Sequence, residues 1–328
     1  MSNLGLPVVV SGIRATGGLH LGNYFGAIRY FFPLQESHRC YFFVADYHTL
    51  TTAPDPEVLR SNRLPIVKTF LATGIDPQKA VIFYQSSLPE VAELTLLLGM
   101  SVPVGELERC VTFKEKVRQN PDNVNHGLLT YPILMAADIL IQKANLVPVG
   151  QDQLQHLEMA RDFASRFNRK YCEIFPSPQS MQGEALRLLG LDGEKMSKSE
   201  HNTIELLDGP ETVSAKILKG VTDTNRKKRN DPGDPQNNCV SIFPLHELFS
   251  STEQAFEIIS GCKAGTLACV ECKKMVAEKV NGFLAPFQEK YRQFSNDYVK
   301  DVLLAGAKQA KDNAQVTLSE VRQAMGLD

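Results

Sequence analysis

Two short segments of the chain carry residue types suited to binding phosphate. The first, Ser11–Asn23, is a glycine-rich turn that follows the apolar run Val8–Val10 and opens a predicted helix. Backbone N–H groups and the positive end of a helix dipole gather at such a turn, and glycines let a nucleotide approach the backbone closely. The second, Lys195–Ser199, places two lysines and two serines on a predicted loop. Either segment alone could be structural, but the pair predicts a nucleotide site.

Four of the seven cysteines fall within one short segment, with 22, 6 and 2 residues between them: Cys239, Cys262, Cys269 and Cys272. Four thiolates fit either a [4Fe–4S] cluster or a tetrahedral zinc ion, and a terminal Cys-x-x-Cys is common to both. Four unrelated buried cysteines are the alternative. The other three cysteines fall in apolar or helical stretches and are predicted to lie in the core: Cys40, Cys110 and Cys172.

The elements that position these segments are predicted from the alternation of apolar runs with helical patterns in the first half of the chain. Val8–Val10, Cys40–Ala45 and Ala80–Tyr84 are the predicted strands, and Pro56–Thr73 is a predicted helix. This alternation is typical of a parallel sheet with crossover helices. We therefore expect an α/β fold with a Rossmann-like catalytic domain at 1–208.

A helical insertion is expected at about 105–185, with helices at Glu106–Arg118, Thr130–Gln142 and Gln151–Phe167. The run Leu146–Val149 is apolar enough for a strand. Pro148 has no N–H to give to a ladder, so this run is predicted to be at most a short edge strand.

From residue 209 onward the pattern is helix and loop, including a proline-interrupted helical run over Leu267–Ala305. This pattern predicts a separate all-helical domain at 209–328.

Composition and net charge limit the classes of protein to which the chain can belong. With 328 residues, 43% hydrophobic and 22% charged, we expect an ordinary globular protein of two domains, or of one domain with a large insertion. The net charge of −2 gives no global sign of a nucleic-acid partner. The clearest basic run, Asn225–Arg229, could meet phosphates or be a solvated loop. No export signal and no apolar run of roughly 20 residues is found, so we expect a cytoplasmic protein with no membrane segment.

The two phosphate-binding segments resemble the signature elements of class I aminoacyl-tRNA synthetases. His20–Asn23 is similar to the "HIGH" element, and Lys195–Ser199 to the "KMSKS" loop. Members of this superfamily activate an amino acid by in-line attack of its carboxylate on the ATP α-phosphate, and then transfer it to the 3′ end of tRNA. Positioning and charge stabilisation carry most of such catalysis. The resemblance implies catalytic roles for His20, Lys195 and Lys198.

The same resemblance implies a set of contacts to ATP. Arg14 and Ala15 depart from the family pattern, which often has glutamine and proline there, and a cation at residue 14 could contact phosphate directly. Lys114, in a segment that also fits the resemblance, would reach the ATP phosphates. The implied ATP-binding residues are Arg14, Ala15, Thr16, Gly22, Asn23, Gly150, Gln151, Asp152, Leu188, Lys195, Met196, Ser197, Lys198 and Ser199.

The stretch Thr130–Leu140, with the following Val147–His156, resembles the amino-acid pocket of tryptophanyl-tRNA synthetases. Asp138 lies three residues after Met135 on one helical face, so both side chains could point into one pocket. An indole offers one N–H donor, and a carboxylate is the complementary acceptor. A surface or helix-pairing carboxylate is the structural alternative. The implied tryptophan-binding residues are Asp138, Met135, Tyr131, Gln153, Gly12, Val10, His48, Val147 and Val149, with Gln153 at the substrate ammonium.

The resemblance runs from Val8 to Leu327 and extends to the four cysteines, because a subgroup of these synthetases has the same intervals and binds a [4Fe–4S] cluster. It favours the cluster over zinc and implies that 209–328 is the tRNA anticodon-binding domain. The cluster is expected to support that domain or contact the anticodon.

The resemblance as a whole implies a tryptophan–tRNA ligase that uses ATP with Mg²⁺, L-tryptophan and tRNA(Trp), and that forms a homodimer. Three alternatives share part of the pattern. A tyrosyl-tRNA synthetase has the same two signature elements, and a small-molecule nucleotidyltransferase has a similar His-x-Gly-His turn but generally lacks a helical domain like 209–328. A non-catalytic paralogue could use the fold to bind RNA or sense iron, although the lysines at 195 and 198 are intact.

Overall fold

The computed structural model describes residues 5–119, 121–150, 153–181, 188–196 and 200–328. The chain forms two compact units. The first consists of residues 1–17, 29–185 and 294–328, and the second of 18–28 and 186–293. Among the described residues, no helix is both long and apolar enough to cross a membrane.

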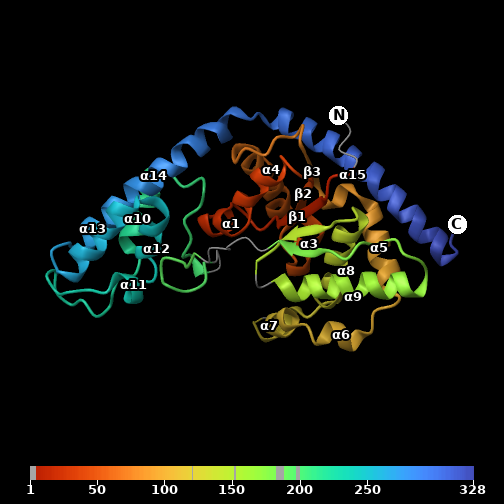
Figure 1. Cartoon of the computed structure of the whole chain (residues 1–328), viewed down its shortest axis with the longest axis horizontal. Helices are drawn as coiled ribbons and strands as arrows, with labels where there is room; N and C mark the ends of the chain where they lie inside the picture. The colour runs from red at the N-terminus through yellow and green to blue at the C-terminus, as the bar shows by residue number, and fades with distance from the viewer. Residues whose placement is uncertain (1–4, 120, 151–152, 182–187, 197–199) are drawn as a thin grey trace. The chain divides into compact units, whose positions relative to one another are not determined.

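The first unit is built on a parallel five-stranded sheet, so the predicted α/β class is confirmed (Figure 1). β1 and β2 pair in parallel from Val8↔Arg39 to Arg14↔Ala45, and this register brings the carboxyl ends of both strands to one edge. Ligand sites in such sheets lie outside the carboxyl ends of the strands. The strand order is β3-β2-β1-β4-β5, with bounds β1 Val8–Arg14, β2 Arg39–Ala45, β3 Ala80–Tyr84, β4 Leu146–Pro148 and β5 Gln179–Met181.

Leu146–Val149 was expected to be at most a short edge strand. A short strand does form there, but it does not lie at the edge of the sheet. β4 lies inside the sheet, where Leu146 pairs with Val9 of β1 and with Gln179 of β5. Because β4 has only three residues, the missing N–H of Pro148 removes at most one ladder hydrogen bond. A proline is therefore tolerated in an interior strand that is this short.

The helices of the first unit follow the predicted pattern with local differences. Asp55 caps α4 by accepting hydrogen bonds from the N–H groups of Glu57 and Val58, and Pro56 occupies the first helical position. The single helix predicted over Glu106–Arg118 is instead two helices, and the break between them buries Cys110. The helices are α2 Phe31–Leu34, α3 Asp46–Thr49, α4 Pro56–Ala72, α5 Pro89–Gly99, α6 Val104–Glu108, α7 Val111–Gln119, α8 His126–Ile141, α9 Leu154–Lys170 and α15 Asn296–Met325.

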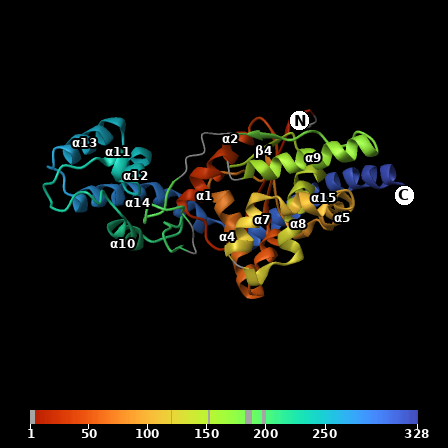
Figure 2. The same ribbon diagram turned by 90° about the horizontal axis from the view of Figure 1, so that it is seen from below.

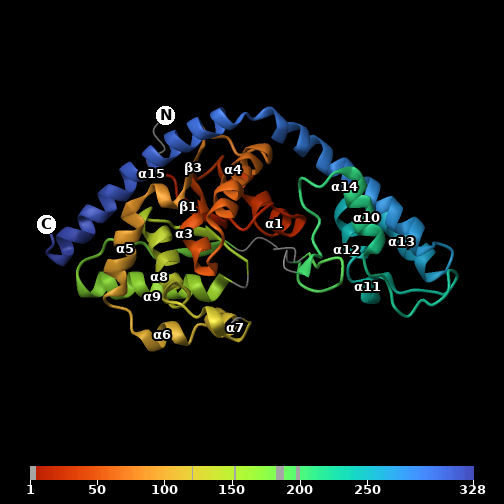
Figure 3. The same cartoon turned by 180° about the vertical axis from the view of Figure 1, so that it is seen from behind.

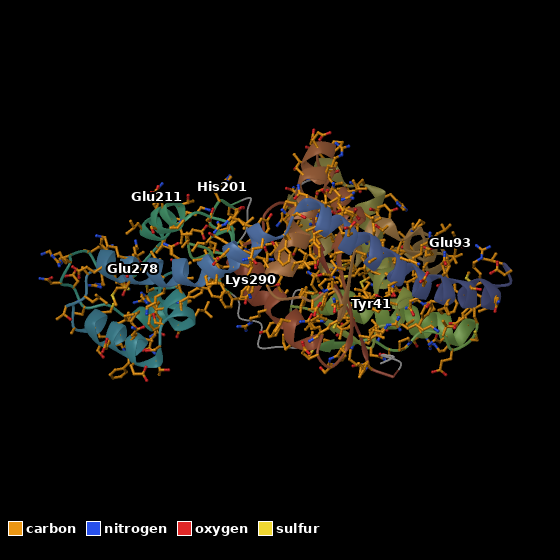
Figure 4. All side chains as sticks on the ribbon, turned by 90° about the horizontal axis from the view of Figure 1, so that it is seen from above. Tyr41, Glu93, His201, Glu211, Glu278 and Lys290 are labelled. Atoms are coloured by element: carbon orange, nitrogen blue, oxygen red, sulfur yellow. The ribbon has the colours of Figure 1, made fainter. Side chains whose placement is uncertain are left out.

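Two helices from distant parts of the sequence cover this sheet. α9 packs against α8 and β5, as Figure 2 shows from below. α15 packs against β3 and α5. Figure 4 shows Glu93 of α5 beside the C-terminal end of α15, where Arg322 Nη1 lies 2.6 Å from its Oε1. The core between these layers includes Tyr41, which is fully buried.

Gly306 is the point of closest approach between α15 and the sheet. A Cβ atom built at this residue would collide with the backbone carbonyl of Ile82 in β3. Backbone atoms of a strand cannot move aside as a flexible side chain can. The absence of a side chain at residue 306 therefore allows the helix to lie directly on the strand.

We expect Gly306→Ala to destabilise the fold by about 2 kcal/mol, because overpacking a dense core forces backbone shifts. The neighbouring Ala307→Gly is the control, and should cost only about 1 kcal/mol through its lower helix propensity. Urea unfolding measures both changes. Equal destabilisation by the two variants would contradict this account of the contact.

The second unit is helical in its described part, apart from short turns and isolated bridges. α10 packs against α14, and α12 packs against both α13 and α14, as Figure 3 shows from behind. Pro286 lies inside α14 without ending it, and the break comes later, where Ser295 caps α15. The helices are α1 Leu21–Gly26, α10 Pro210–Lys219, α11 Pro235–Asn238, α12 Phe243–Phe249, α13 Thr252–Lys263 and α14 Cys269–Gln293.

Aromatic rings connect α1 to the helices of the second unit. The ring of Phe25 lies 5.5 Å from that of Phe249 on α12 and 5.7 Å from that of Phe283 on α14. These separations are within the range of favourable aromatic pairs. The short helix that begins at the predicted "HIGH" element is therefore held by the helical unit.

Candidate active site

A buried carboxylate forms the centre of the predicted amino-acid pocket. Asp138 lies on α8 and is 8% exposed. Its Oδ2 accepts a hydrogen bond of 2.7 Å from Nε2 of Gln85, in the short 3-10 helix η3 Gln85–Ser87 that follows β3. Burial raises the pKa of Asp138 well above its usual value, the Gln85 hydrogen bond opposes this rise, and the nearby Asp46 adds to it. The surface-carboxylate alternative for Asp138 is therefore wrong.

His48 lies at the end of β2, in α3, on the other side of Gln85. Its backbone N–H donates to Oε1 of Gln85 at 3.0 Å. Its ring packs edge-to-face against Tyr131 with centroids 5.2 Å apart. Burial, together with the nearby positive charges of Arg14 and Lys116, lowers the pKa of His48 to about 3. The imidazole is therefore neutral at physiological pH.

A hydrogen-bonded chain continues from Tyr131 to Gln153. The Tyr131 hydroxyl lies 2.6 Å from Nε2 of His156, and Nδ1 of His156 lies 3.0 Å from Oε1 of Gln153. A carbonyl oxygen only accepts, so Nδ1 of His156 carries the proton of the hydrogen bond to Gln153. Cys110 Sγ joins the same group, 3.5 Å from Nε2 of His156. The chain fixes the side chains of Tyr131 and Gln153, two of the predicted tryptophan contacts.

Burial alone would raise the pKa of Cys110. Hydrogen bonds with His156, the Phe113 backbone and Tyr131 outweigh it and lower the pKa to about 7.

The remaining predicted pocket residues lie on elements that meet in the first unit. α3 and α8 both contact β1, and β1 pairs with β4. Val10 and Val147 are buried, while Met135 and Val149 are half-buried and pack against the core. A Cβ atom on Gly12 would lie 2.5 Å from the Phe43 ring, so only glycine fits there without a shift.

Two cations face this pocket from β1 and α7. Arg14 donates to Thr52 Oγ1 at 3.4 Å, and its buried Nε has no hydrogen-bond partner among the described residues. Lys116 is half-buried, and burial followed by repulsion from Arg14 lowers its pKa. Among the described residues, neither cation forms an ion pair with a carboxylate. Two neighbouring, partly buried cations without such a partner are the electrostatic pattern of an anion site.

Lys116 was not singled out from the sequence, whereas Lys114 was. Lys114 is exposed in the structure. Ala15 is buried, and its backbone N–H donates a hydrogen bond to Thr49 Oγ1 at 2.9 Å. This hydrogen bond fixes the backbone at Ala15. Thr16 is exposed and Gly150 is half-buried. The predicted ATP contacts Gln151 and Asp152 lie outside the described residues.

The second unit brings together the two signature segments, which are far apart in the sequence. His20 forms an isolated β-bridge with Glu205, and the Leu21 N–H donates to the Ile204 carbonyl at 2.9 Å. A Cβ atom on Gly22 would lie 3.0 Å from the His20 ring and 3.2 Å from the sulfur of Met196. The "HIGH" element and the start of the "KMSKS" loop are therefore adjacent.

Local hydrogen bonds shape both segments. The side-chain oxygen of Asn23 accepts the His20 N–H at 3.1 Å. Asn202 Nδ2 donates to both carboxylate oxygens of Asp192 and to the Lys195 carbonyl, at 2.9 to 3.1 Å. Lys195 is exposed. Leu188 is buried, and Ser197, Lys198 and Ser199 lie outside the described residues.

The four spaced cysteines lie within electrostatic range of one another in the second unit. Burial raises the pKa of Cys272 to about 12, and the other three thiols contribute to that rise. In the described part of the chain, however, no group of three or more His, Cys, Asp or Glu side chains is arranged so that it could hold a metal ion. Of the three predicted core cysteines, Cys40 and Cys110 are buried, but Cys172 is exposed because it follows the end of α9.

The basic run Asn225–Arg229 is not a uniform solvated patch. Arg226 turns inward, and its Nη1 lies 3.6 Å from the sulfur of Cys262 and 3.5 Å from that of Cys269. Arg229 pairs with Glu271 at 2.9 Å. Two of the four charges in this run therefore already have partners within the protein.

Comparison with known proteins agrees with this geometry. The chain matches the family of class I tRNA synthetases (W and Y) over residues 5–285. It is 45% identical to a tryptophan–tRNA ligase of Porphyromonas gingivalis, with 98% of this chain and 99% of that protein covered. The corresponding protein of Thermotoga maritima is 44% identical over 97% and 99% of the two chains.

A solved structure of tryptophanyl-tRNA synthetase from Campylobacter jejuni, complexed with ADP and tryptophan, also superposes on this chain. The TM-score is 0.88 at 38% identity, and the match covers 98% of this chain and 100% of the other. Since the family match covers residues 5–285 and the relatives extend over nearly the whole length, the chain belongs to the class I tRNA synthetase family of the tryptophan and tyrosine enzymes.

Proposed function

We infer that the chain catalyses the two steps of tryptophan–tRNA ligation. In the first, an oxygen of the tryptophan carboxylate attacks the α-phosphorus of ATP, and the bond to the bridging oxygen breaks to release pyrophosphate. In the second, the tryptophanyl group passes to a hydroxyl at the 3′ end of tRNA(Trp), and AMP leaves. The relatives that cover nearly the full chain carry this activity in their names.

Asp138 is the observation that supports tryptophan as the amino acid. One of its oxygens is occupied by Gln85, and the carboxylate is buried within the first unit. The other oxygen is the complement of an indole N–H, and a buried acceptor rejects a substrate that lacks the donor. Tyr131, Met135 and His48 would line the same pocket, and Gln153 would meet the substrate ammonium.

ATP–pyrophosphate exchange tests this function directly. The purified chain should exchange label in the presence of L-tryptophan and not of L-tyrosine or L-phenylalanine. Exchange that depends on tyrosine would establish the tyrosine enzyme instead. No exchange with any amino acid, in a chain that still binds tRNA, would favour the non-catalytic alternative.

In the second unit, the two signature segments are proposed to bind ATP. His20, Gly22 and Asn23 would contact the nucleotide at the start of α1, and Lys195 and Lys198 would act on its phosphates. Within the first unit, Arg14 and Lys116 support the binding of an anion, because their charges lack carboxylate partners in the described part of the chain. Mg²⁺ is expected to arrive with ATP and to neutralise part of the phosphate charge.

Residues 209–328 are proposed to bind tRNA, and residues 1–208 to carry out catalysis. Lys227 and Lys228 are exposed in this region, where they could meet tRNA phosphates. α15 belongs to the predicted tRNA-binding part by sequence, although it packs on β3. We also propose that the protein is cytoplasmic.

A homodimer is proposed through the first unit. Large apolar side chains at and after the end of α5 are exposed: Leu96 is 58% exposed, Met100 is 69% and Val104 is 58%. Leu96 and Met100 are four residues apart and so share one helix face. Exposed apolar residues of this kind support an interface with a second copy of the chain.

A [4Fe–4S] cluster, or alternatively Zn²⁺, is proposed at Cys239, Cys262, Cys269 and Cys272. All four thiols interact electrostatically, and Arg226 hydrogen-bonds to two of them. A guanidinium beside four thiolates would offset the negative charge of a bound cluster. Such a group would cross-link α13, α14 and the loop before α12, and so stabilise the unit without taking part in the reaction.

We expect Cys272→Ser to lower the bound metal to background and to reduce the melting temperature. Cys172→Ser is the matched control, because Cys172 is an exposed cysteine in the other unit. Elemental analysis for iron and zinc, with the visible spectrum, measures occupancy and separates the two metals. Wild-type protein that holds neither metal after anaerobic purification would refute the proposal.

A further inference from the structure

Gln85 occupies a fully buried position between two parts of the proposed amino-acid pocket. It is 0% exposed, and both ends of its amide are hydrogen-bonded. Oε1 accepts the backbone N–H of His48 at 3.0 Å, and Nε2 donates to Oδ2 of Asp138 at 2.7 Å. The side chain therefore connects the ends of β2 and β3 to α8.

The orientation of this amide follows from its partners. A backbone N–H can only donate, so Oε1 must face His48 and Nε2 must face Asp138. A flipped amide would place two donors against each other at His48. Asp138 therefore always receives a hydrogen bond on Oδ2, and its other oxygen is left to accept from a substrate.

We propose that Gln85 is a specificity-determining positioning residue, which presents the free oxygen of Asp138 as an acceptor for the indole N–H of tryptophan. This inference rests on the proposed role of Asp138. Gln85 acts through Asp138 and does not itself touch the substrate. The fixed amide also opposes protonation of Asp138, because its N–H favours an acceptor at Oδ2.

The Asp138→Asn variant is a sensitive test of the orientation that Gln85 imposes on residue 138. In Asp138→Asn, the Gln85 N–H requires the asparagine oxygen, so the asparagine NH₂ turns towards the indole N–H and two donors oppose each other. In the double variant Gln85→Met/Asp138→Asn, the asparagine can rotate and offer its oxygen to the indole. A second substitution that removes a hydrogen bond should then restore activity.

The experiment measures tryptophan-dependent ATP–pyrophosphate exchange for the wild type, the two single variants and the double variant. We expect Gln85→Met to raise the KM for tryptophan by about 10- to 100-fold while the KM for ATP stays constant, the scale of one hydrogen bond to a charged group. The double variant should exceed Asp138→Asn in kcat/KM by about tenfold or more. Selectivity against an alanine analogue with benzothiophene in place of indole should fall in Gln85→Met.

Gln35→Met is the matched control. Gln35 is also buried, and its amide is held at both ends by backbone groups, donating to Gly74 O at 3.1 Å and accepting from the Asp76 N–H at 2.8 Å. It should lose stability comparable to that lost by Gln85→Met but keep the wild-type KM for tryptophan. Melting temperatures of all variants separate folding from substrate binding.

The outcomes distinguish this inference from the proposed function. A wild type with no tryptophan-dependent exchange, or an Asp138→Asn variant with wild-type kinetics, would overturn the function assigned to the pocket. If the wild type does show tryptophan-dependent exchange and Asp138→Asn does impair it, a double variant no better than Asp138→Asn, together with an unchanged tryptophan KM in Gln85→Met, overturns the role of Gln85 alone.

Discussion

Replacing Asp138 with asparagine is expected to lower kcat/KM for tryptophan by at least about 10³-fold. The side chain is nearly isosteric, so the fold should persist, but the acceptor that meets the indole N–H is exchanged for a donor. A site built for a polar contact discriminates on this scale when the contact is lost. Steady-state pyrophosphate exchange measures the change, and an unaltered melting temperature shows that the variant is folded. A loss below about tenfold would remove Asp138 from the recognition of the indole.

The same carboxylate predicts a pH dependence. Burial raises the pKa of Asp138, so in the free enzyme it takes up a proton at a higher pH than an exposed aspartate. The protonated form offers an O–H donor where the indole needs an acceptor. The kcat/KM for tryptophan should therefore fall as the pH falls through this raised pKa. His48, whose pKa is about 3, stays neutral above that value and adds no second step in the neutral range. Asp138→Asn should abolish the acid limb.

Replacing Lys116 with methionine is expected to reduce the rate of tryptophan activation by about 100-fold and to raise the melting temperature. Removing one donor that stabilises charge at a reacting centre typically has an effect of this size on kcat. Without ATP, the Lys116 cation is half-buried beside Arg14 and lowers the stability of the fold, as its depressed pKa indicates. Activity and stability should therefore change in opposite directions.

The sign of the stability change follows from linkage. A lysine with a folded-state pKa below its unfolded value binds fewer protons when folded, so stability is gained as the pH rises through the folded pKa. Below the folded-state pKa both states carry the charge, and its cost is fully present. Methionine removes that cost, which we expect to raise the melting temperature by roughly 2 °C. Arg118→Met, an exposed cation on the same helix, is the control for both measurements. Unchanged activation kinetics in Lys116→Met would contradict the anion site.

Local patterns predicted the strands well because the signal is local. Val8–Val10, Cys40–Ala45 and Ala80–Tyr84 are apolar β-rich runs bounded by turns, and each is a strand of the sheet. The position of β4 was predicted wrongly because proline is excluded from interior strands that need many ladder hydrogen bonds, whereas β4 has only three residues. How many partners a strand has depends on segments that arrive from elsewhere in the chain.

Most residues of the candidate site that were named from the sequence belong to short sequence motifs. Gly22 of the "HIGH" element and Met196 of the "KMSKS" loop are adjacent, and Asp138 is buried in α8. Gln85, Lys116 and His156 were missed, because their importance comes from partners that are distant in the sequence. Gln85 follows β3 and looks like an ordinary turn residue until His48 and Asp138 are placed on either side of it. Lys116 differs from Lys114 only in the direction in which α7 presents it.

The sequence by itself determined several elements and chemical groups of this protein: three strands of the parallel sheet, the glycine-rich and lysine-rich segments, the carboxylate on α8 and the four spaced cysteines. These depend on residue type and on spacing within one helix, strand or turn, which short-range geometry fixes. Only the tertiary structure decided which groups are buried and which face one another. Desolvation and hydrogen bonding depend on packing between distant segments. They turn Gln85 into an oriented donor and His48 into a neutral ring, and packing brings the cations of Arg14 and Lys116 near each other.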